Sequence, residues 1–463
     1  MAPPLILWAL LACSRRPALS RAEVPDVIVL TVDTLRHDAV GDATPRISAL
    51  ATRGVRFTQA TTPLPRTTPA LASMLTGHLP AGHGSREVGE AISSGIPTVA
   101  ARFAAAGYTT VGISGTPVAG PKQGLDAGFE HFAVHFDLPA PQLSAEALAH
   151  ADTDRPLFLW VHYVDPHFPY LPPDAPPGPC RDLGQQAAGG DLVRADLFTD
   201  RDGIASSALA HCRTLYALEV ATADAGIGAL LDGLEARGRR AGLVVVSADH
   251  GEHFGEEGIF YEHGPSVHDA ALRVPLVVSG DGTVPHTDTG VARLEDLAPT
   301  LLAFAGLPPL PGTDGQDLTA RLGGAAPPDD RIVAAESGGA LHARFFLSLR
   351  SGRPSKRLCL NDPPWSLCAH RSGVTRLYNH VDDPALTADQ TAARPDVVAR
   401  LLAAEAHWPL EARQQTARDH RHKLTAFPLL EGGYRTEAAT VGGEPAGPQP
   451  ALEARLYSNV ARE

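Results

Sequence analysis

Residues 61–84, TTPLPRTTPALASMLTGHLPAGHG, place a pair of threonines and a proline at the start of a short helix-like run that stops at Gly77. The first turn of a helix carries unpaired backbone N–H groups and the positive end of the helix dipole, so it is suited to binding an anion. A hydroxyl held there, on Thr67, is a candidate nucleophile. Taken alone, however, the same residues more often form an N-cap with proline in the first turn.

Two apolar, strand-like segments end in acidic residues. The run VIVLTV leads into Asp33, and the run LVVVSA leads into Asp249 and His250. In an open α/β sheet, ligands bind outside the carboxyl ends of the strands, so these side chains are expected to converge. Two carboxylates and an imidazole suit one divalent cation, and we expect Ca²⁺, Mn²⁺ or Mg²⁺, with Zn²⁺ as the alternative.

Histidines are frequent in the same parts of the chain. His167 and His263 lie in segments rich in proline and glycine that follow strand ends, where we expect them to contact the substrate and one of them to act as a general acid. His162 stands inside an apolar strand, and we interpret it as a hydrogen-bonded core residue.

Strand-like and helix-like segments alternate along most of the chain, which predicts an α/β fold with a large, mostly parallel sheet sandwiched by helices. The expected strands are residues 27–32, 109–114, 157–164, 243–248 and 275–280. The expected helices are residues 45–54, 97–108, 215–238 and 294–307. Residues 171–203 are rich in proline, glycine and aspartate, and we expect a long loop there.

The bulk properties and the N-terminus indicate an exported globular protein. The 463 residues carry a net charge of −13, which argues against a nucleic-acid binder. An apolar run from Leu5 to Ala12 is too short to cross a bilayer and is typical of a secretory signal. The run ends in a lipobox-like Leu-Leu-Ala-Cys, so we expect a periplasmic or cell-envelope protein, anchored in the membrane only through a lipid on Cys13. Cleavage before Glu23 is the alternative, and no further segment is expected to cross a membrane.

Four cysteines remain when Cys13 is set aside. An even number in an exported chain is typical of disulfides, and the order of the cysteines along the sequence suggests the pairs Cys180–Cys212 and Cys359–Cys368.

Over about residues 24–320 the chain resembles the sulfatase family of the alkaline phosphatase superfamily. The segments that carry the resemblance run in order, and they include PDVIVLTVDTLRHDAVG, TPRISALATRGVRFTQA, TTPALASMLTGHLPAGHG, HYVDPHFPY, VVVSADHGEHFGEEG and HGPSVHDAALRVPLVV. The resemblance implies an alkaline phosphatase-like fold and a metal-dependent hydrolase of sulfate esters or related phosphate esters. The substrate would be an ester of a small molecule, a carbohydrate or a lipid.

The resemblance also places the family's nucleophile at Thr67, because that position lies a fixed step before Leu-Thr-Gly. Sulfatases oxidise a cysteine or serine there to formylglycine, so none is expected on a threonine. The family's motif arginine is Leu71 in this chain, and its second metal-binding aspartate is Thr34. Arg86 is our candidate for replacing the missing positive charge, with a structural salt bridge as an equally weighted alternative.

Two further interpretations stay open. The set Asp33, Thr67, Asp249 and His250 around one metal is similar to phosphoglycerol transferases of the lipoteichoic acid synthase type, which use threonine directly. The chain would then be a phosphodiesterase or phosphotransferase. Alternatively, it is a catalytically silent, anion-binding lipoprotein. We favour catalysis, because a decayed site has no physical reason to keep polar residues at strand ends.

We divide the chain into four parts on these grounds. Residues 1–23 are a signal peptide or lipoprotein leader with its linker, residues 24–320 a sulfatase-like catalytic domain, residues 321–430 a small C-terminal α+β subdomain, and residues 431–463 a flexible tail. A helix near residues 395–420 should pack back on the subdomain.

Overall fold

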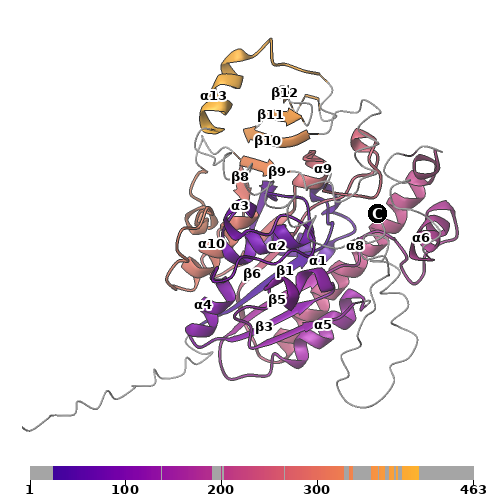
Figure 1. Ribbon diagram of the computed structural model, residues 1–463. Coiled ribbons are helices and arrows are strands. Elements are labelled where there is room, and N and C mark those ends of the chain that lie inside the picture. Colours follow the sequence, from indigo (N-terminus) through magenta and orange to yellow (C-terminus); the bar gives the residue numbers. More distant parts are fainter. Residues whose placement is uncertain are drawn as a thin grey trace, which may run out of the picture.

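A twisted eight-stranded sheet forms the centre of the molecule, in the order β4-β3-β5-β1-β6-β7-β2-β8 (Figure 1). The computed structural model describes residues 24–136, 138–189, 200, 203–264, 266–327, 333–336, 356–362, 364–370, 375–379, 382–383 and 388–405. The strands are β1 Asp26–Val32, β2 Val55–Thr61, β3 Thr109–Ser114, β4 His131–Val134, β5 Leu157–Tyr163, β6 Ala241–Ala248, β7 Leu276–Gly280 and β8 His286–Arg293. Strand β7 is antiparallel to both neighbours, and every other pair in this sheet is parallel.

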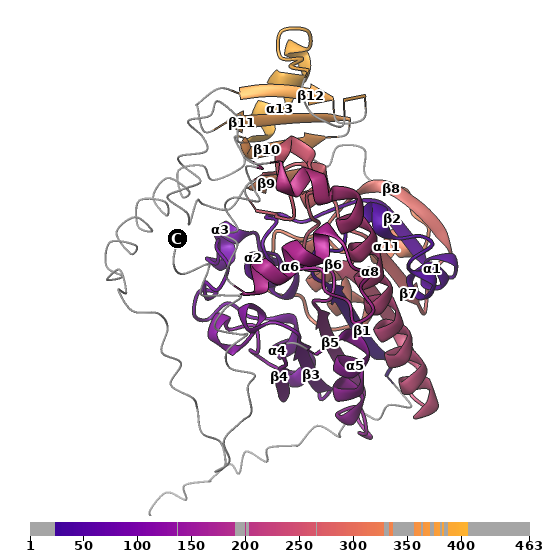
Figure 2. The same cartoon turned by 90° about the vertical axis from the view of Figure 1, so that its right-hand side faces the viewer.

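Helices cover both faces of this sheet. One group consists of α1 (Pro45–Thr52), α5 (Ala140–Ala149) and α8 (Ile204–Ala236), in which α8 contacts both of the others. A second group consists of α2 (Thr67–Thr76), α4 (Val99–Ala105) and α10 (Leu297–Phe304), in which α10 contacts the other two. Figure 2 shows α2 and α4 on the opposite face of the sheet from α8. The shorter helices are α3 Pro80–His83, α9 Asp269–Leu272 and α11 Thr319–Leu322, with 3-10 turns η1 His37–Ala39, η2 Pro117–Ala119, η3 Pro121–Gln123, η4 Glu256–Gly258 and η5 Leu294–Asp296.

The central strands are continuous apolar runs because helices bury them on both faces. Every residue of β1 and β5 is buried, as are all but the first of β6. The five predicted strands and four predicted helices are therefore confirmed, apart from their ends. The strands β2, β4 and β8 were not predicted, because their sequences VRFTQAT, HFAV and HTDTGVAR are too polar or too short for that pattern.

The prediction of a long loop over residues 171–203 is wrong for α6 (Pro179–Gly189). The predicted disulfide between Cys180 and Cys212 is confirmed and ties α6 to α8, with Cα atoms 5.0 Å apart. Burial of Cys180 and Leu183 against the core offsets the weak helix propensity of this glycine- and polar-rich segment.

Helix α8 begins eleven residues earlier than predicted, at Ile204 instead of residue 215. Contrary to the expectation that no segment after the leader could cross a membrane, its length and composition alone would allow it to span a bilayer. However, 56% of the qualifying window is buried inside the fold, where α8 packs against α5, α1 and α6. We interpret it as a core helix.

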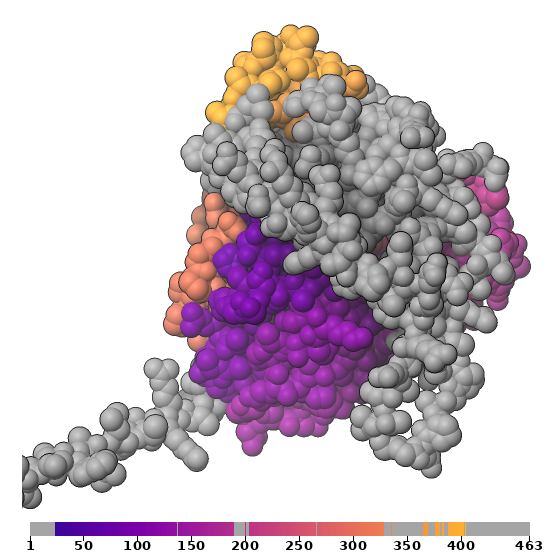
Figure 3. Space-filling view, viewed as in Figure 1, coloured from indigo at the N-terminus to yellow at the C-terminus, as the bar shows by residue number. Residues whose placement is uncertain are grey.

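A separate antiparallel sheet, in the order β12-β11-β10-β9, stands beyond the carboxyl ends of the large sheet (Figure 2). Its strands are β9 Val333–Glu336, β10 Lys356–Asp362, β11 Trp365–His370 and β12 Thr375–Asn379, and the helix α13 Pro395–Glu405 packs on it. Three of its side chains pack on the large domain, in a cluster of Val267, Leu272, Ala335, Cys368 and Tyr378. In the space-filling view its described residues form the orange and yellow surface at the top (Figure 3).

Cys368 is disulfide-bonded, and the strand register places it opposite Cys359, as the second predicted pair requires. The predicted C-terminal helix is described only as far as Glu405. The leader at residues 1–23 and the tail at 431–463 lie outside the described residues.

Candidate functional site

The candidate side chains lie at the carboxyl ends of three neighbouring central strands, β5, β1 and β6. Val32 of β1 pairs with Ala248 of β6, so Asp33 and Asp249 follow directly at the same level. On the other side of β1, Thr31 pairs with His162 of β5. The backbone N–H of Asp33 donates to the carbonyl of Tyr163, which holds this turn against β5.

The imidazoles and carboxylates at these strand ends face one another. Asp33, His162 and Asp249 each present a potential ligand atom, and these three atoms lie within 4.8 Å of one another. His250 Nε2 lies 3.3 Å from Asp249 Oδ2 and 3.8 Å from Asp33 Oδ1, and His162 Nε2 lies 3.7 Å from Asp33 Oδ2. All four side chains are almost completely buried.

Thr67 reaches this cluster from the start of α2. It is the first residue of that helix, it is buried, and its Oγ1 lies 3.4 Å from His250 Nε2. The helix ends at Gly77 in the left-handed conformation, with φ of 71°, as the sequence suggested. The neighbouring Thr68 has a structural role instead, because its hydroxyl donates to the carbonyl of Val118 and accepts from the N–H of Gly89.

Burial and charge set the protonation states in the cluster. The ring of His250 donates through Nδ1 to the carbonyl of Gly251, 3.0 Å away, so its Nε2 carries the lone pair that faces the carboxylates. Burial lowers the pKa of His250 well below its usual range, which keeps the ring neutral. Burial, and secondly the charge of Asp33, raise the pKa of Asp249 well above its usual range.

The donor set fits a divalent cation. Two buried carboxylates this close repel each other unless a positive charge lies between them. Within the described part of the chain, Asp249 Oδ2 and His162 Nε2 are buried and make no hydrogen bond. Carboxylate oxygens and neutral imidazole nitrogens are ligands that divalent metals accept, so Asp33, Asp249, His250 and His162 could hold one ion.

The interpretation of His162 as a core residue is thus incomplete. Its Nδ1 does form a core hydrogen bond of 2.9 Å with Thr31 Oγ1, which also accepts from Trp160 Nε1. Its other nitrogen, however, is directed to the carboxylates. The sequence holds no signal for this, because it depends on the pairing of β5 with β1.

His263 and His167 lie next to the cluster. The ring of His263 stacks on that of His250, with centroids 3.9 Å apart, and its Nδ1 lies 3.3 Å from Oε1 of the buried Glu252. His167 is partly buried and places its ring against His263, with centroids 5.4 Å apart. The predicted histidines are therefore brought together, and Glu252 is a neighbour that the sequence analysis did not single out.

The positions where this chain departs from the family pattern are occupied by residues with other roles. The hydroxyl of Thr34 donates to the carbonyl of Asp33, and its backbone N–H donates to Asp249 Oδ1. Leu71 is fully buried in the core. The backbone N–H of Arg86 donates to the carboxylate of Glu90, and Arg86 remains a candidate for substrate binding on sequence grounds.

A second arginine, Arg66, lies closer to the site than the sequence analysis recognised. It occupies the N-cap position of α2, directly before Thr67, and after burial its charge is one of the smaller causes that lower the pKa of His250. Its guanidinium fills the space beside Gly264, where any Cβ would collide with it. Arg66 thus presents a positive charge near the nucleophile position, with Glu87 as an ion-pair partner at 3.9 Å.

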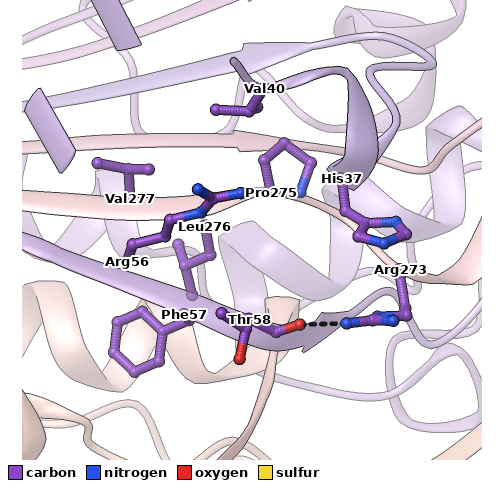
Figure 4. A pocket seen from close by; sticks show the side chains of 9 residues that line it. All are labelled: His37, Val40, Arg56, Phe57, Thr58, Arg273, Pro275, Leu276 and Val277. Atoms are coloured by element: carbon purple, nitrogen blue, oxygen red, sulfur yellow. Dashed lines mark hydrogen bonds between the residues drawn. The ribbon is translucent and has the colours of Figure 1, made fainter. Parts of the chain in front are cut away.

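A pocket of about 160 Å³ lies elsewhere, between η1 and the strands β2 and β7 (Figure 4). It is lined by His37, Val40, Arg56, Phe57, Thr58, Arg273, Pro275, Leu276 and Val277. Because none of the clustered residues lines it, it is not the site described above.

Residues 25–307 match the Sulfatase family, and the chain belongs to that family. Among curated relatives, choline-sulfatase of Rhizobium meliloti (strain 1021) is 24% identical and covers 88% of this chain and 92% of its own. Human arylsulfatase A is 26% identical and covers 86% of this chain and 90% of its own. The phosphonate monoester hydrolase of Agrobacterium radiobacter superposes with a TM-score of 0.66 at 20% identity, over 85% of this chain and 96% of that one.

These likenesses confirm the resemblance and the fold class expected from the sequence. The chain is an ester hydrolase of the sulfuric ester type. Enzymes of this family depend on a metal, and the disulfides are typical of an oxidising compartment outside the cytosol.

Proposed function

We propose that this chain cleaves its ester substrate by direct attack of Thr67 in a site that holds one divalent metal between Asp33, Asp249 and His250. The observation that carries the proposal is the position of Thr67 Oγ1, which lies at the first residue of α2 and 3.4 Å from His250 Nε2. The identity of the ion is left open, because the mixed oxygen and nitrogen donors suit Mg²⁺, Mn²⁺, Ca²⁺ and Zn²⁺.

A bound divalent ion would lower the pKa of the Thr67 hydroxyl and offset the negative charge of the ester. The hydroxyl of Thr67 releases its proton to solvent, and Oγ1 forms a bond to sulfur or phosphorus as the bond from that atom to the alcohol oxygen breaks. The backbone N–H groups at the start of α2 would then stabilise the anionic oxygens of the group being transferred. Water afterwards cleaves the threonine ester, releasing sulfate or phosphate and restoring Thr67.

The leaving alkoxide needs a proton, and His263 is positioned to provide it. Its stacking on His250 places it beside the nucleophile, and the carboxylate of Glu252 at 3.3 Å stabilises a protonated ring. His167 packs against His263 and is the second candidate. For substrate binding, Arg66 and Arg86 are the candidate cations that replace the arginine missing at Leu71.

A phosphorus ester is the second candidate substrate class, and Thr67 itself favours it. A threonine ester of phosphate is an ordinary covalent intermediate, whereas a threonine ester of sulfate needs a hydrolysis step that formylglycine avoids. This would make the chain a phosphodiesterase or phosphotransferase with a sulfatase fold.

The test measures turnover of p-nitrophenyl sulfate, p-nitrophenyl phosphate and bis-p-nitrophenyl phosphate by metal-loaded protein. We expect Thr67→Ala to lose roughly 10³-fold or more in kcat on every active substrate, because the variant lacks the proposed nucleophile. Thr67→Ser should keep measurable activity. Thr68→Ala is the matched control and should affect stability more than turnover, because both described hydrogen bonds of the Thr68 hydroxyl are to backbone groups.

Wild-type rates in Thr67→Ala would disprove direct attack by threonine and would direct the search to metal-bound water. If no ester is turned over by the wild-type protein although it binds metal, the silent, anion-binding alternative is supported.

We also propose that Cys13 carries the lipid that anchors the mature protein to the cell envelope. The support is the lipobox-like sequence, in residues outside the described structure, together with the disulfide chemistry of an exported chain. Cys13→Ala should move the protein from the membrane fraction to the soluble fraction of fractionated cells. Retention of this variant in membranes would contradict the anchor, and finding four free thiols in the denatured, unreduced protein would contradict export.

A further inference from the structure

A second group of metal-ligand side chains lies between the edge strand β4 and helix α5. His131 begins β4 and His135 directly follows it, while Glu146 and His150 stand one turn apart at the end of α5. His131, Glu146 and His150 each present a ligand atom, and these three atoms lie within 4.8 Å of one another. His135 Nε2 lies 3.5 Å from Oε1 of the same Glu146.

This group is separate from the catalytic cluster. Strand β4 lies three strands away from β1, with β3 and β5 between them. His131 pairs with Val111, three residues before Ser114, which in turn pairs with His162. Strands lie about 4.8 Å apart and rise about 3.3 Å per residue, so the backbones of His131 and His162 are roughly 14 Å apart.

The contacts exceed those of an ordinary helix-surface ion pair. His150 and Glu146 alone, at 3.4 Å, would be a common i, i+4 pair beside the helix C-terminus. However, the ring of His131 stacks on that of His150 with centroids 3.3 Å apart, and His135 approaches Glu146 from β4. In the described structure, Nε2 of His131 and Nε2 of His135 are buried and make no hydrogen bond.

We propose that His131, Glu146 and His150 bind a second divalent ion of the Zn²⁺ class, with His135 or water completing the coordination. Two or three imidazoles and one carboxylate are a typical zinc donor set. In a tetrahedral zinc site the ligand atoms are roughly 3.3–3.5 Å apart. The 4.8 Å within which the three atoms lie here is only slightly larger, and the side chains of Glu146, His150 and His135 are about one third exposed, which leaves them room to adjust.

The ion would fasten the edge strand to the helix that covers it. Helix α5 packs on β3 and β5. Strand β4 is the outermost strand of the described sheet, and β3 is its neighbour. Coordination from both elements therefore stabilises the folded sheet edge, and the role is structural and independent of the proposed catalytic mechanism.

The test measures binding of Zn²⁺ by chelator competition, together with the visible absorption of Co²⁺ as a replacement. The measurements are made on the double variant Asp33→Asn/Asp249→Asn, which lacks both carboxylates of the catalytic cluster. We expect this variant to bind one Zn²⁺ per chain. The absorption spectrum of bound Co²⁺ should be that of an ion with four or five ligands, and Zn²⁺ should raise the thermal unfolding midpoint. Adding His131→Gln and His150→Gln should weaken that binding by at least about 100-fold.

His286→Gln is the matched control, because His286 is a partly exposed histidine near a single carboxylate, Asp288. It should leave Zn²⁺ binding unchanged. Should the Asp33→Asn/Asp249→Asn variant not fold, wild-type protein and His131→Gln/His150→Gln are compared directly, and two ions per chain should fall to one while ester turnover remains. Unchanged Zn²⁺ stoichiometry and affinity in the His131→Gln/His150→Gln protein would overturn the proposal.

Discussion

At the scale of single residues, the chemistry of the candidate site depends on which nitrogen of each histidine carries a proton. His250 and His162 both use Nδ1 for a local hydrogen bond, to the carbonyl of Gly251 and to Thr31 Oγ1. Each directs Nε2 to the carboxylates of Asp33 and Asp249. Hydrogen bonds of this kind orient a ligating imidazole before the metal arrives, which makes the site rigid without any ion.

We predict that His162→Gln weakens metal binding by about 10–100-fold, because a ligand atom or its close support is lost. The measurement is metal affinity by competition with a chelating dye, alongside thermal unfolding of the metal-free protein. Trp160→Phe is the control, since it removes the other hydrogen bond to Thr31 but no atom near the carboxylates. If His162→Gln binds metal as tightly as the wild type and only lowers the unfolding temperature, His162 is simply a core residue.

At the scale of elements, hydrogen bonds connect the segment after β1 to helix α8 and to the segment after β6, and so hold the site together. The hydroxyl of Tyr216 on α8 donates to the carbonyl of Thr34 and accepts from the N–H of Arg36. The guanidinium of Arg36 bonds to the carbonyl of Glu252 and to the side chain of Glu256. The turn after β1 is therefore fastened both to α8 and to the segment after β6, which carries the partner of His263.

Helix α8 also introduces a pH dependence of stability through Glu219. Burial, and secondly the charge of Asp165, raise the pKa of Glu219 to about 8, while its Oε1 accepts from the N–H of Leu171. The folded state thus keeps a proton that the unfolded state releases near pH 4.5, and the stability from this group is lost as the pH rises from about 4.5 to about 8.

We predict that Glu219→Gln flattens this decline and raises the unfolding temperature at pH 9, because the amide keeps the acceptor for Leu171 and cannot ionise. Thermal unfolding from pH 5 to pH 9 measures the effect, with the wild type as the reference. An equally steep decline in both proteins would show that Glu219 is not responsible for it.

At the scale of the whole molecule, the sequence predicts local features well and long-range ones poorly. The central strands and the two acidic strand ends were predictable, since apolar runs and the residues that end them are neighbours in the chain. The positions of His162 and Arg66 were not, because they depend on which strands pair and which loop packs on α2. Helix α6 was missed because a disulfide and burial, not its own composition, stabilise it.

The most direct test of the account is a crystal structure of the protein soaked with Mn²⁺, with the ion located by anomalous diffraction. We predict an anomalous peak between Asp33, Asp249 and His250, with Thr67 Oγ1 within the coordination shell at about 2.0–2.4 Å. Absence of a peak there under conditions that support turnover, or an ion that Thr67 does not approach, would contradict the central claim that a metal-activated threonine attacks the ester.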